Sequence, residues 1–278
     1  MFSPYMALMK LRVVELLLVT TLPALFLAAD GIPPLDITIA TLVGGTLAAG
    51  AANAFNMVIE SDIDKVMTRT SKRPIVNEQV TEGQALTFAF VIAAISLLIF
   101  WFFTNPLATG LTVSAIAFYV FGYTVGLKRR TSQNIVWGGI AGCLPVLIGW
   151  AAITNSLSFT AFWFFMVIFF WTPPHFWALA IKYKDDYAAA GVPMLPVVAP
   201  IRKVRQQMWF HTIAMIITSL LTLYSAGSNT WTYFVTAILG AVFALQVRDP
   251  DKNSGKIFQG SITYLSLYSI LLVVAVFI

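Results

Sequence analysis

Charged residues are scarce in this chain of 278 residues, at 10% of the sequence, whereas hydrophobic residues make up 59%. A soluble domain usually carries about 25% charged residues, so the composition excludes an ordinary soluble protein. The mean hydropathy of +0.82 predicts an integral membrane protein surrounded by membrane lipid. The isoelectric point is near 9.4, but the basic residues are too few and too scattered to predict a nucleic-acid partner. We assign most of this basicity to membrane orientation.

The chain is also poor in the residues that build thiolate and imidazole sites. Its one cysteine, Cys143, excludes an internal disulfide framework and lies in an apolar, glycine-rich stretch typical of packing. Only two histidines are present, His175 and His211, and neither lies near the first acidic cluster described below. No glycine-rich loop of the kind that cradles nucleotide phosphates occurs, which argues against nucleotide hydrolysis.

Long apolar runs are what the chain has in abundance. A transmembrane helix needs roughly 20 apolar residues. Nine such runs occur, at residues 13–29, 37–59, 84–104, 107–127, 135–153, 159–181, 207–227, 231–247 and 260–278. No linker or low-complexity tract separates them, so residues 1–278 are predicted to form a single domain. The predicted fold is all-α, a polytopic membrane protein with nine transmembrane helices.

The basic residues alternate with these runs along the chain. Every Lys and Arg falls in the N-terminal segment or in the second, fourth, sixth and eighth connections. Because basic loops stay in the cytoplasm, the N-terminus is predicted to be cytoplasmic and the C-terminus to lie outside. The first run follows Lys10 and Arg12 as a signal peptide would, but Glu15 within it favours a retained helix.

A first acidic cluster closes the second run and begins inside it. Asn53, Asn56, Glu60 and Asp64 have a spacing that places them on one face of a helix. Polar groups at membrane depth face the bundle interior and need partners, and oxygen ligands suit Mg²⁺. The pattern therefore predicts a magnesium site, with Asp62 off the face. The alternative is a helix end whose acids are satisfied by nearby basic residues alone.

A second acidic cluster, Asp185 and Asp186, ends the sixth run on the same predicted side. Pro173 and Pro174 precede it and are expected to kink or break that helix, because proline removes a backbone donor. The pair is a candidate for a second metal ion opposite the first cluster. A solvated helix end flanked by lysines is the alternative.

Cations lie on the same predicted side as both acidic clusters. Lys128 and Arg129 occupy the fourth connection, and Arg73 lies in the second. Arg binds phosphate oxygens in pairs, whereas Lys acts as a point charge. Cations that face a carboxylate–Mg²⁺ site favour a diphosphate, and an apolar organic part would explain a site at a membrane surface.

These residues resemble the UbiA-type intramembrane prenyltransferases, all-helical enzymes with two Asp-rich motifs that bind Mg²⁺ and a prenyl diphosphate. Asn56, Glu60 and Asp64 look like the first motif. Residues 60–74, 127–149 and 171–196 are similar to the haem-modifying branch of that superfamily, and the nine-helix pattern covers the whole chain. The chain departs from the superfamily in having Lys182 before Asp186, where two acids are usual, and Leu11 where a proline is expected.

The resemblance implies transfer of a farnesyl group from farnesyl diphosphate to a vinyl group of haem B, giving haem O, with Mg²⁺ as cofactor. It implies a bacterial cytoplasmic (inner) membrane location, with the active site on the cytoplasmic side and other haem-modifying or oxidase-assembly membrane proteins as partners. The catalytic candidates are Asn56, Glu60, Asp64, Tyr123, Lys182 and Asp186. The metal candidates are Asn56, Glu60, Asp64, Asp185 and Asp186, and the substrate-binding candidates are Arg69, Arg73, Lys128, Arg129, Lys184 and His175.

Two alternatives stay open at this point. A UbiA-type enzyme could act on a quinone ring or a lipid acceptor instead of haem. An ion-coupled transporter could use the acids to bind its coupling ion, but such sites lie near the middle of the bilayer. The acids here lie at the ends of the predicted helices, which favours an enzyme.

Overall fold

The computed structural model describes residues 4–278, which form helices and loops with no strand among them. Nine spans are long and apolar enough to cross a membrane. They are α2 (Leu11–Ala29), α3 (Leu35–Ile59), α5 (Glu82–Phe103), α6 with the π-helix η1 (Pro106–Ala117, Phe118–Leu127), α7 with α8 (Asn134–Gly138, Ile140–Thr154), α9 (Phe159–Lys182), α12 (Ile201–Ser225), α13 (Thr230–Val247) and α14 (Pro250–Ala275). The predicted all-α fold with nine spans is confirmed for the described residues.

Two helices begin six or more residues before the apolar runs predicted. Helix α12 starts at Ile201, directly after Pro200, and α14 starts at Pro250. Proline fits the first turn of a helix because its missing N–H would have no helical partner there. The charged first turns that follow these prolines are helical without being apolar, so a hydropathy criterion misses them.

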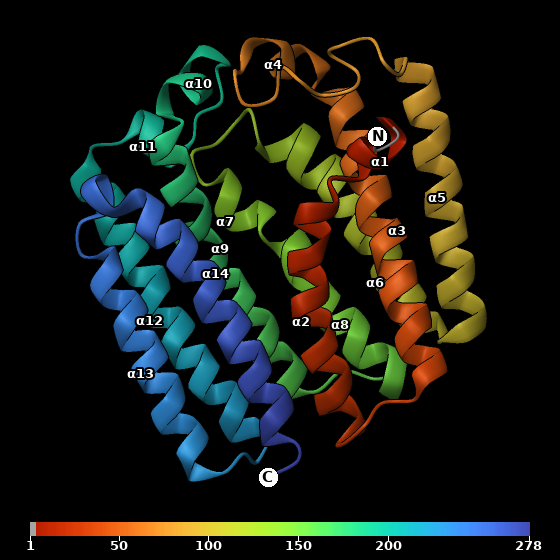
Figure 1. Ribbon diagram of the computed structural model, residues 1–278, viewed down its shortest axis with the longest axis vertical. Helices are drawn as coiled ribbons and strands as arrows, with labels where there is room; N and C mark the ends of the chain where they lie inside the picture. Colours follow the sequence, from red (N-terminus) through yellow and green to blue (C-terminus); the bar gives the residue numbers. More distant parts are fainter. Residues whose placement is uncertain (1–3) are drawn as a thin grey trace.

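The polar connections gather at one end of the bundle. Four short helices lie there, and the C-terminus lies at the opposite end (Figure 1). These helices are α1 (Pro4–Met9), α4 (Ser61–Val66), α10 (Lys184–Ala189) and α11 (Leu195–Val198). The backbone N–H of Arg69 donates to Asp186 Oδ2 at 3.2 Å, so the loops that follow α3 and α9 meet at this end.

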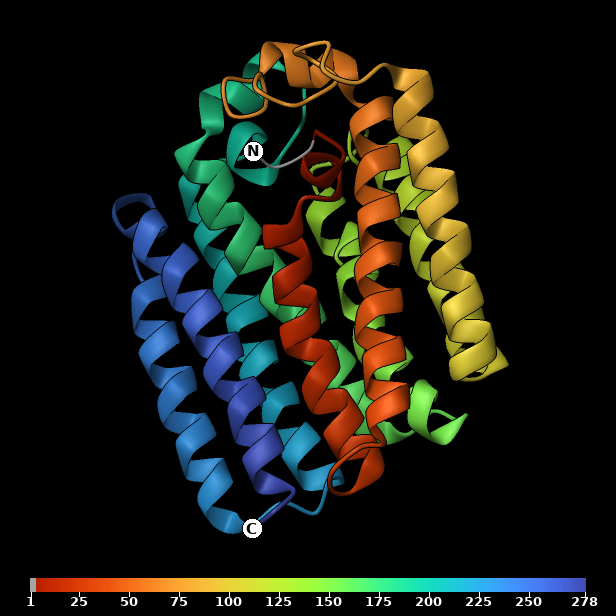
Figure 2. The same cartoon turned by 45° about the vertical axis from the view of Figure 1, so that its right-hand side comes forward.

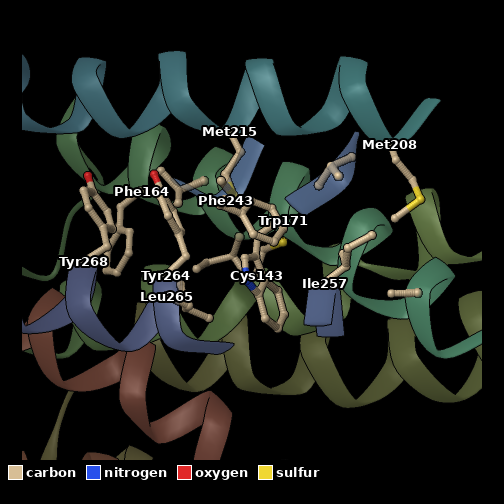
Figure 3. Packing of buried hydrophobic residues seen from close by; sticks show 14 of the residues in the cluster. Cys143, Phe164, Trp171, Met208, Met215, Phe243, Ile257, Tyr264, Leu265 and Tyr268 are labelled. Carbon is tan, nitrogen blue, oxygen red and sulfur yellow. The ribbon is translucent and has the colours of Figure 1, made fainter. Parts of the chain in front are cut away.

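Helix α2 runs through the middle of the bundle. It packs against α3, α8 and α14, while α3 packs mainly against α5 (Figure 2). The largest apolar core lies on the other side, where α9 packs against α12 and α14. Trp171, Met215, Phe243 and Tyr264 meet there from four helices (Figure 3). The bundle therefore has one densely filled half, and a second half built around α2, α3 and α8.

Helix α9 stays continuous from Phe159 to Lys182 with Pro173 and Pro174 inside it, so the predicted break is absent. Beside the prolines, the Thr172 hydroxyl donates to the Ile168 carbonyl at 2.8 Å, and Trp171 Nε1 donates to the Ser261 carbonyl of α14 at 2.7 Å. The indole of Trp171 thus ties this part of α9 to α14.

Candidate active site

A cavity of about 310 Å³ opens among α2, α3, η1, α8 and α9. We call it the chamber. Its polar roof lies at the end of the bundle that carries the short helices, and the rest of its wall is mostly apolar, with threonines among its residues. The roof is formed by Lys10, Asn53, Asn56, Arg69, Arg73, Tyr119, Tyr123, Lys128 and Tyr187. A ligand with a polar head and an apolar body matches this division.

The apolar wall has free room beside two glycines. A Cβ added to Gly45 of α3 or to Gly142 of α8 would meet no atom within 4 Å, and both glycines line the chamber. Ala48 and Ala52 continue the same small-residue side of α3. The chamber is thus widened by the absence of side chains on two of its walls, which suits a flexible hydrocarbon chain.

Two buried acids lie beside the roof, each paired with a cation that lines it. Lys128 Nζ donates to Glu60 Oε2 at 2.5 Å, and Arg73 Nη1 donates to Asp64 Oδ2. The Glu60 and Asp64 side chains are 1% and 3% exposed. Breaking a buried pair leaves an unpaired charge, which costs about 3–5 kcal/mol. The structure therefore brings the predicted acids and two of the predicted cations together.

The helix that carries Asn56 and the two acids is interrupted at Glu60. Helix α3 ends at Ile59, Glu60 takes φ −103° and ψ 13°, and α4 begins at Ser61. The Asp64 N–H still donates to the Glu60 carbonyl at 2.9 Å, which keeps the two acids one turn apart. The four polar residues are buried together at this end of α3, although the helix is not continuous through Glu60.

A π-helix positions the tyrosines of the roof. Within η1, the Thr124 hydroxyl donates to the Tyr119 carbonyl at 2.9 Å and accepts a bond from Asn56 Nδ2 at 3.1 Å. The Tyr119 hydroxyl donates to Asn53 Oδ1 at 3.4 Å, and Tyr123, a catalytic candidate, lines the chamber. Tyr119 and Thr124 were not predicted, because the apolar run gives no sign that this helix widens.

The second acidic cluster is less buried than the first. Asp185, Lys182 and Lys184 are exposed and lie outside the chamber lining. Asp186 is half-buried and accepts the backbone N–H of Arg69. Through this bond, Asp186 joins the loop after α4 to the segment after α9. Asp185 does not line the chamber.

Arg69 joins the second cluster to the chamber. Its Nη2 donates to the Tyr187 hydroxyl at 3.4 Å, and its guanidinium lies 5.9 Å from the centroids of the Tyr183 and Tyr187 rings. Burial raises the pKa of Tyr187, so its phenol keeps its proton. Tyr187 is another roof residue that the sequence did not indicate.

Arg129 lies on the outer surface. It forms a two-point pair with Asp62, at 2.8 and 2.7 Å, and their side chains are 41% and 64% exposed. The hydrogen bonds from Arg129 lower the pKa of the Asp62 carboxyl. The structure thus separates Arg129 from Lys128, its neighbour in sequence, which faces the chamber.

His175 lies behind the chamber wall. Its Nδ1 lies 2.7 Å from Ser261 Oγ, and its ring is stacked between Trp171 and Phe258, with centroids at 4.3 and 4.5 Å. Trp171 lines the chamber, whereas His175 does not. His175 is thus a buried histidine, held by a hydroxyl of α14 and by two aromatic rings.

Residues 17–273 match the UbiA prenyltransferase family. The chain belongs to this family. A protein of Pseudarthrobacter chlorophenolicus named "Protoheme IX farnesyltransferase" is 50% identical over 99% of this chain and 89% of its own length. One of the same name from Frankia casuarinae is 51% identical over 95% of this chain and 94% of its own length.

UbiA-family structures share the fold. A digeranylgeranylglyceryl phosphate synthase superposes with a TM-score of 0.80 at 14% identity, covering 98% of this chain and 97% of that one. A UbiA homologue from Archaeoglobus fulgidus bound to GPP and Mg²⁺ superposes with a TM-score of 0.70 at 14% identity, covering 98% of this chain and 100% of that one. The predicted resemblance to intramembrane prenyltransferases is confirmed, and the protein is an integral membrane protein.

The donor set fits the magnesium ion that this UbiA-family chain is expected to use. The available ligands are all oxygens, and Glu60 Oε1 is buried without a hydrogen-bond partner. No group of three His, Cys, Asp or Glu residues within residues 4–278 is placed to hold a metal ion. Mg²⁺ does not require one, because it usually takes one or two carboxylates, several waters and substrate phosphates. Glu60, Asp64 and the Asn56 amide are the residues that would hold it.

Proposed function

We propose that this protein transfers the farnesyl group of farnesyl diphosphate to a vinyl group of haem B, with addition of water, giving haem O and diphosphate. The observation that carries the proposal is identity of about 50% over nearly the full length with proteins named for this reaction. The chamber supports it, because a cationic roof and an apolar body suit a prenyl diphosphate.

The residues of the roof would receive the diphosphate. Arg73 and Lys128 line the chamber and already face buried carboxylates, so they would stabilise the negative charge that develops as the allylic C–O bond breaks. Preorganised charge of this kind commonly supplies a large part of a rate enhancement. Mg²⁺, when bound, would neutralise the leaving diphosphate.

The apolar wall would hold the farnesyl chain and keep water from the allylic cation. Leu16, Leu17 and Ile168 line this part together with the two glycines. After the vinyl group attacks the allylic carbon, the positive charge on the haem side is quenched by a water oxygen, which releases a proton. That water would enter from the roof, where the charged residues of the chamber gather.

The location belongs to the same proposal. By the positive-inside rule, the end of the bundle that carries the short helices and the chamber roof lies on the cytoplasmic side of a bacterial inner membrane. Farnesyl diphosphate would enter from the cytoplasm. Haem O would leave into the bilayer, where membrane proteins that modify haem further or assemble oxidases would receive it.

The test is product formation in membranes that contain the expressed protein. With haem B, farnesyl diphosphate and Mg²⁺, extracted haem should contain a product heavier by one farnesyl group and one water, and chelation of Mg²⁺ should abolish it. Asp64→Asn should abolish it too. Asp36→Asn is the matched control, because Asp36 is an exposed carboxylate at the opposite end of α3. Farnesylation of a quinone ring or a lipid, with haem B unchanged, would contradict the proposed acceptor.

A further inference from the structure

One side of α3 lines the chamber from its roof to its deep end. Below Asn56 at the roof, Ala52, Ala48, Gly45 and Thr41 follow at intervals of three or four residues, and all of them line the chamber. Side chains at this spacing share one face of a helix. We call this face the α3 strip. It is polar at its two ends and carries only small residues between them, so it borders an apolar stretch of defined length.

The chamber ends at a packed apolar cluster just beyond Thr41. Leu25, Phe100 and Ala108 are fully buried in this cluster, and Ile37, one turn further from the roof along α3, packs against it. Thr41 lines the chamber, yet it is only 1% exposed because its side chain lies against its neighbours. The Thr41 side chain therefore forms the floor of the chamber.

The two polar ends of the α3 strip differ in their hydrogen bonds. Asn56 Oδ1 accepts a bond from Lys10 Nζ at 2.8 Å, and Asn56 Nδ2 donates to the Thr124 hydroxyl at 3.1 Å. The Thr41 hydroxyl is buried and has no hydrogen-bond partner within residues 4–278. The other threonines that line the chamber donate to carbonyls of their own helices; they are Thr20, Thr21, Thr112 and Thr172. The floor thus carries an unpaired hydroxyl, which is a poor neighbour for hydrocarbon.

The α3 strip matches the length of a farnesyl group. Gly45 is 11 residues from Asn56 and Thr41 is 15, which places them about 16 Å and about 22 Å below it at 1.5 Å per residue. The main carbon chain of an extended farnesyl group spans on the order of 15 Å, with C–C bonds of about 1.5 Å. With the diphosphate at the roof, that chain ends beside Gly45, where an added Cβ would meet no atom within 4 Å. One further isoprene unit adds roughly 5 Å and would reach Thr41.

We propose that Thr41 is a specificity-determining residue that limits the prenyl donor to three isoprene units, an inference that rests on the proposed function. A donor with four units would press its last unit against the floor. A donor with two units would leave the room beside Gly45 unfilled. Both lose affinity, because a packed interior tolerates neither overlap nor voids. The chamber would thus select its donor at the hydrocarbon end, independently of the charges at the roof.

The experiment measures the binding of three donor analogues to the purified full-length protein in detergent. The analogues are the S-thiolodiphosphates of geraniol, farnesol and geranylgeraniol, which keep the diphosphate but ionise slowly; Mg²⁺ is present and haem is absent. Thr41→Ala should raise the affinity for the geranylgeranyl analogue relative to the farnesyl analogue by about tenfold, the lower end of the range for one methylene in an apolar pocket. Affinity for the geranyl analogue, whose chain ends above the floor, should stay within about twofold.

Two further variants serve as controls. Thr41→Val keeps the shape of the floor and removes only its unpaired hydroxyl, so it should retain the preference for farnesyl while the melting temperature stays the same or rises. Thr46→Ala makes the same substitution as Thr41→Ala on the same helix. The Thr46 hydroxyl donates to the Leu42 carbonyl at 2.7 Å and Thr46 does not line the chamber, so none of the three affinities should change.

An unchanged ratio of geranylgeranyl to farnesyl affinity in Thr41→Ala would overturn the proposal, because longer chains would then leave the chamber between helices. An equal change for all three analogues would overturn it as well. If Thr41→Ala does not fold, Thr41→Ser, which loses only a methyl group, should shift the ratio in the same direction by a smaller factor.

The absence of haem keeps this test separate from the proposed acceptor. A shifted ratio in Thr41→Ala would support the floor even if haem B proved not to be the acceptor. Normal binding of the farnesyl analogue by the parent protein without any haem O formation would contradict the proposed function and leave the assignment of Thr41 intact.

Discussion

The two acidic clusters look alike in sequence but differ in their surroundings. Each follows a membrane helix, each carries neighbouring lysines or arginines, and both lie at the same end of the bundle. Yet Glu60 and Asp64 are buried and bonded to cations from other segments, whereas Asp185 is exposed and Asp186 accepts a backbone N–H. The difference shows that similar acidic spacing can lead to different burial and different partners, which only the tertiary structure decides.

The largest effect is expected from neutralising the first cluster. Glu60→Gln and Asp64→Asn should each lower kcat/KM by about 100-fold or more, because each removes a charge that would hold Mg²⁺ against the diphosphate. Haem O formation at saturating Mg²⁺ measures it. Asp185→Asn is the matched control from the second cluster and should stay close to the parent protein. A loss of kcat/KM in Asp185→Asn as large as in Asp64→Asn would show that both clusters contribute to the reaction.

Stability should respond to the first cluster as well, through its ion pairs. Glu60→Leu leaves Lys128 without its buried partner and should lower the free energy of unfolding by about 3–5 kcal/mol. The double variant Glu60→Leu/Lys128→Met should recover most of that loss, yet remain inactive. Denaturant melts of the single and double variants in detergent measure the coupling. If the stability losses of the single variants simply add in the double variant, the two side chains do not interact as a buried pair.

Filling the chamber should alter substrate choice while leaving both clusters intact. Gly45→Phe places a ring in the free space beside α3, so kcat/KM for farnesyl diphosphate should fall on the order of tenfold relative to the shorter geranyl diphosphate. Competition between the two donors gives the ratio directly. Gly110→Phe, at an exposed glycine of α6 with equal free space, should leave the ratio unchanged.

A modest effect is expected at the half-buried member of the second cluster. Asp186→Asn keeps an oxygen that can accept the Arg69 N–H but weakens the bond, so the loss should be about 0.5–1.5 kcal/mol of stability. Activity should fall by only a few-fold, through a looser Arg69. A loss in Asp186→Asn as large as in Asp64→Asn would instead indicate a second metal site.

The smallest effect is expected at Arg129. Its pair with Asp62 is solvent-exposed, and exposed pairs contribute roughly 0–1 kcal/mol. Arg129→Ala should therefore keep the KM for farnesyl diphosphate within about threefold, whereas Lys128→Ala should raise it far more. A steady-state titration of both variants compares two adjacent cations on opposite sides of one loop.

Much of this architecture could be predicted because it depends on local patterns. Apolar runs gave the nine spans, and polar residues inside one run indicated where Asn56 and Glu60 would face inward. Partnerships between distant segments could not be predicted, since nothing local links Lys10 to Asn56 or Arg129 to Asp62. The bond from Trp171 of α9 to the Ser261 carbonyl likewise joins two helices that are far apart in the sequence.

The π-helix η1 determines the direction around the helix axis in which the side chains after it point. A wider turn accommodates one residue more than an α-helical turn, and one residue corresponds to about 100° of rotation. Within this widened stretch, Tyr123 lines the chamber and Thr124 accepts a hydrogen bond from Asn56. Lys128 follows directly and donates to Glu60. Deleting one residue between Thr124 and Lys128 would turn Lys128 toward a different neighbour while removing no side chain of the roof. The geometry of the site therefore depends partly on the number of residues in this segment, which stays the same when individual side chains are substituted.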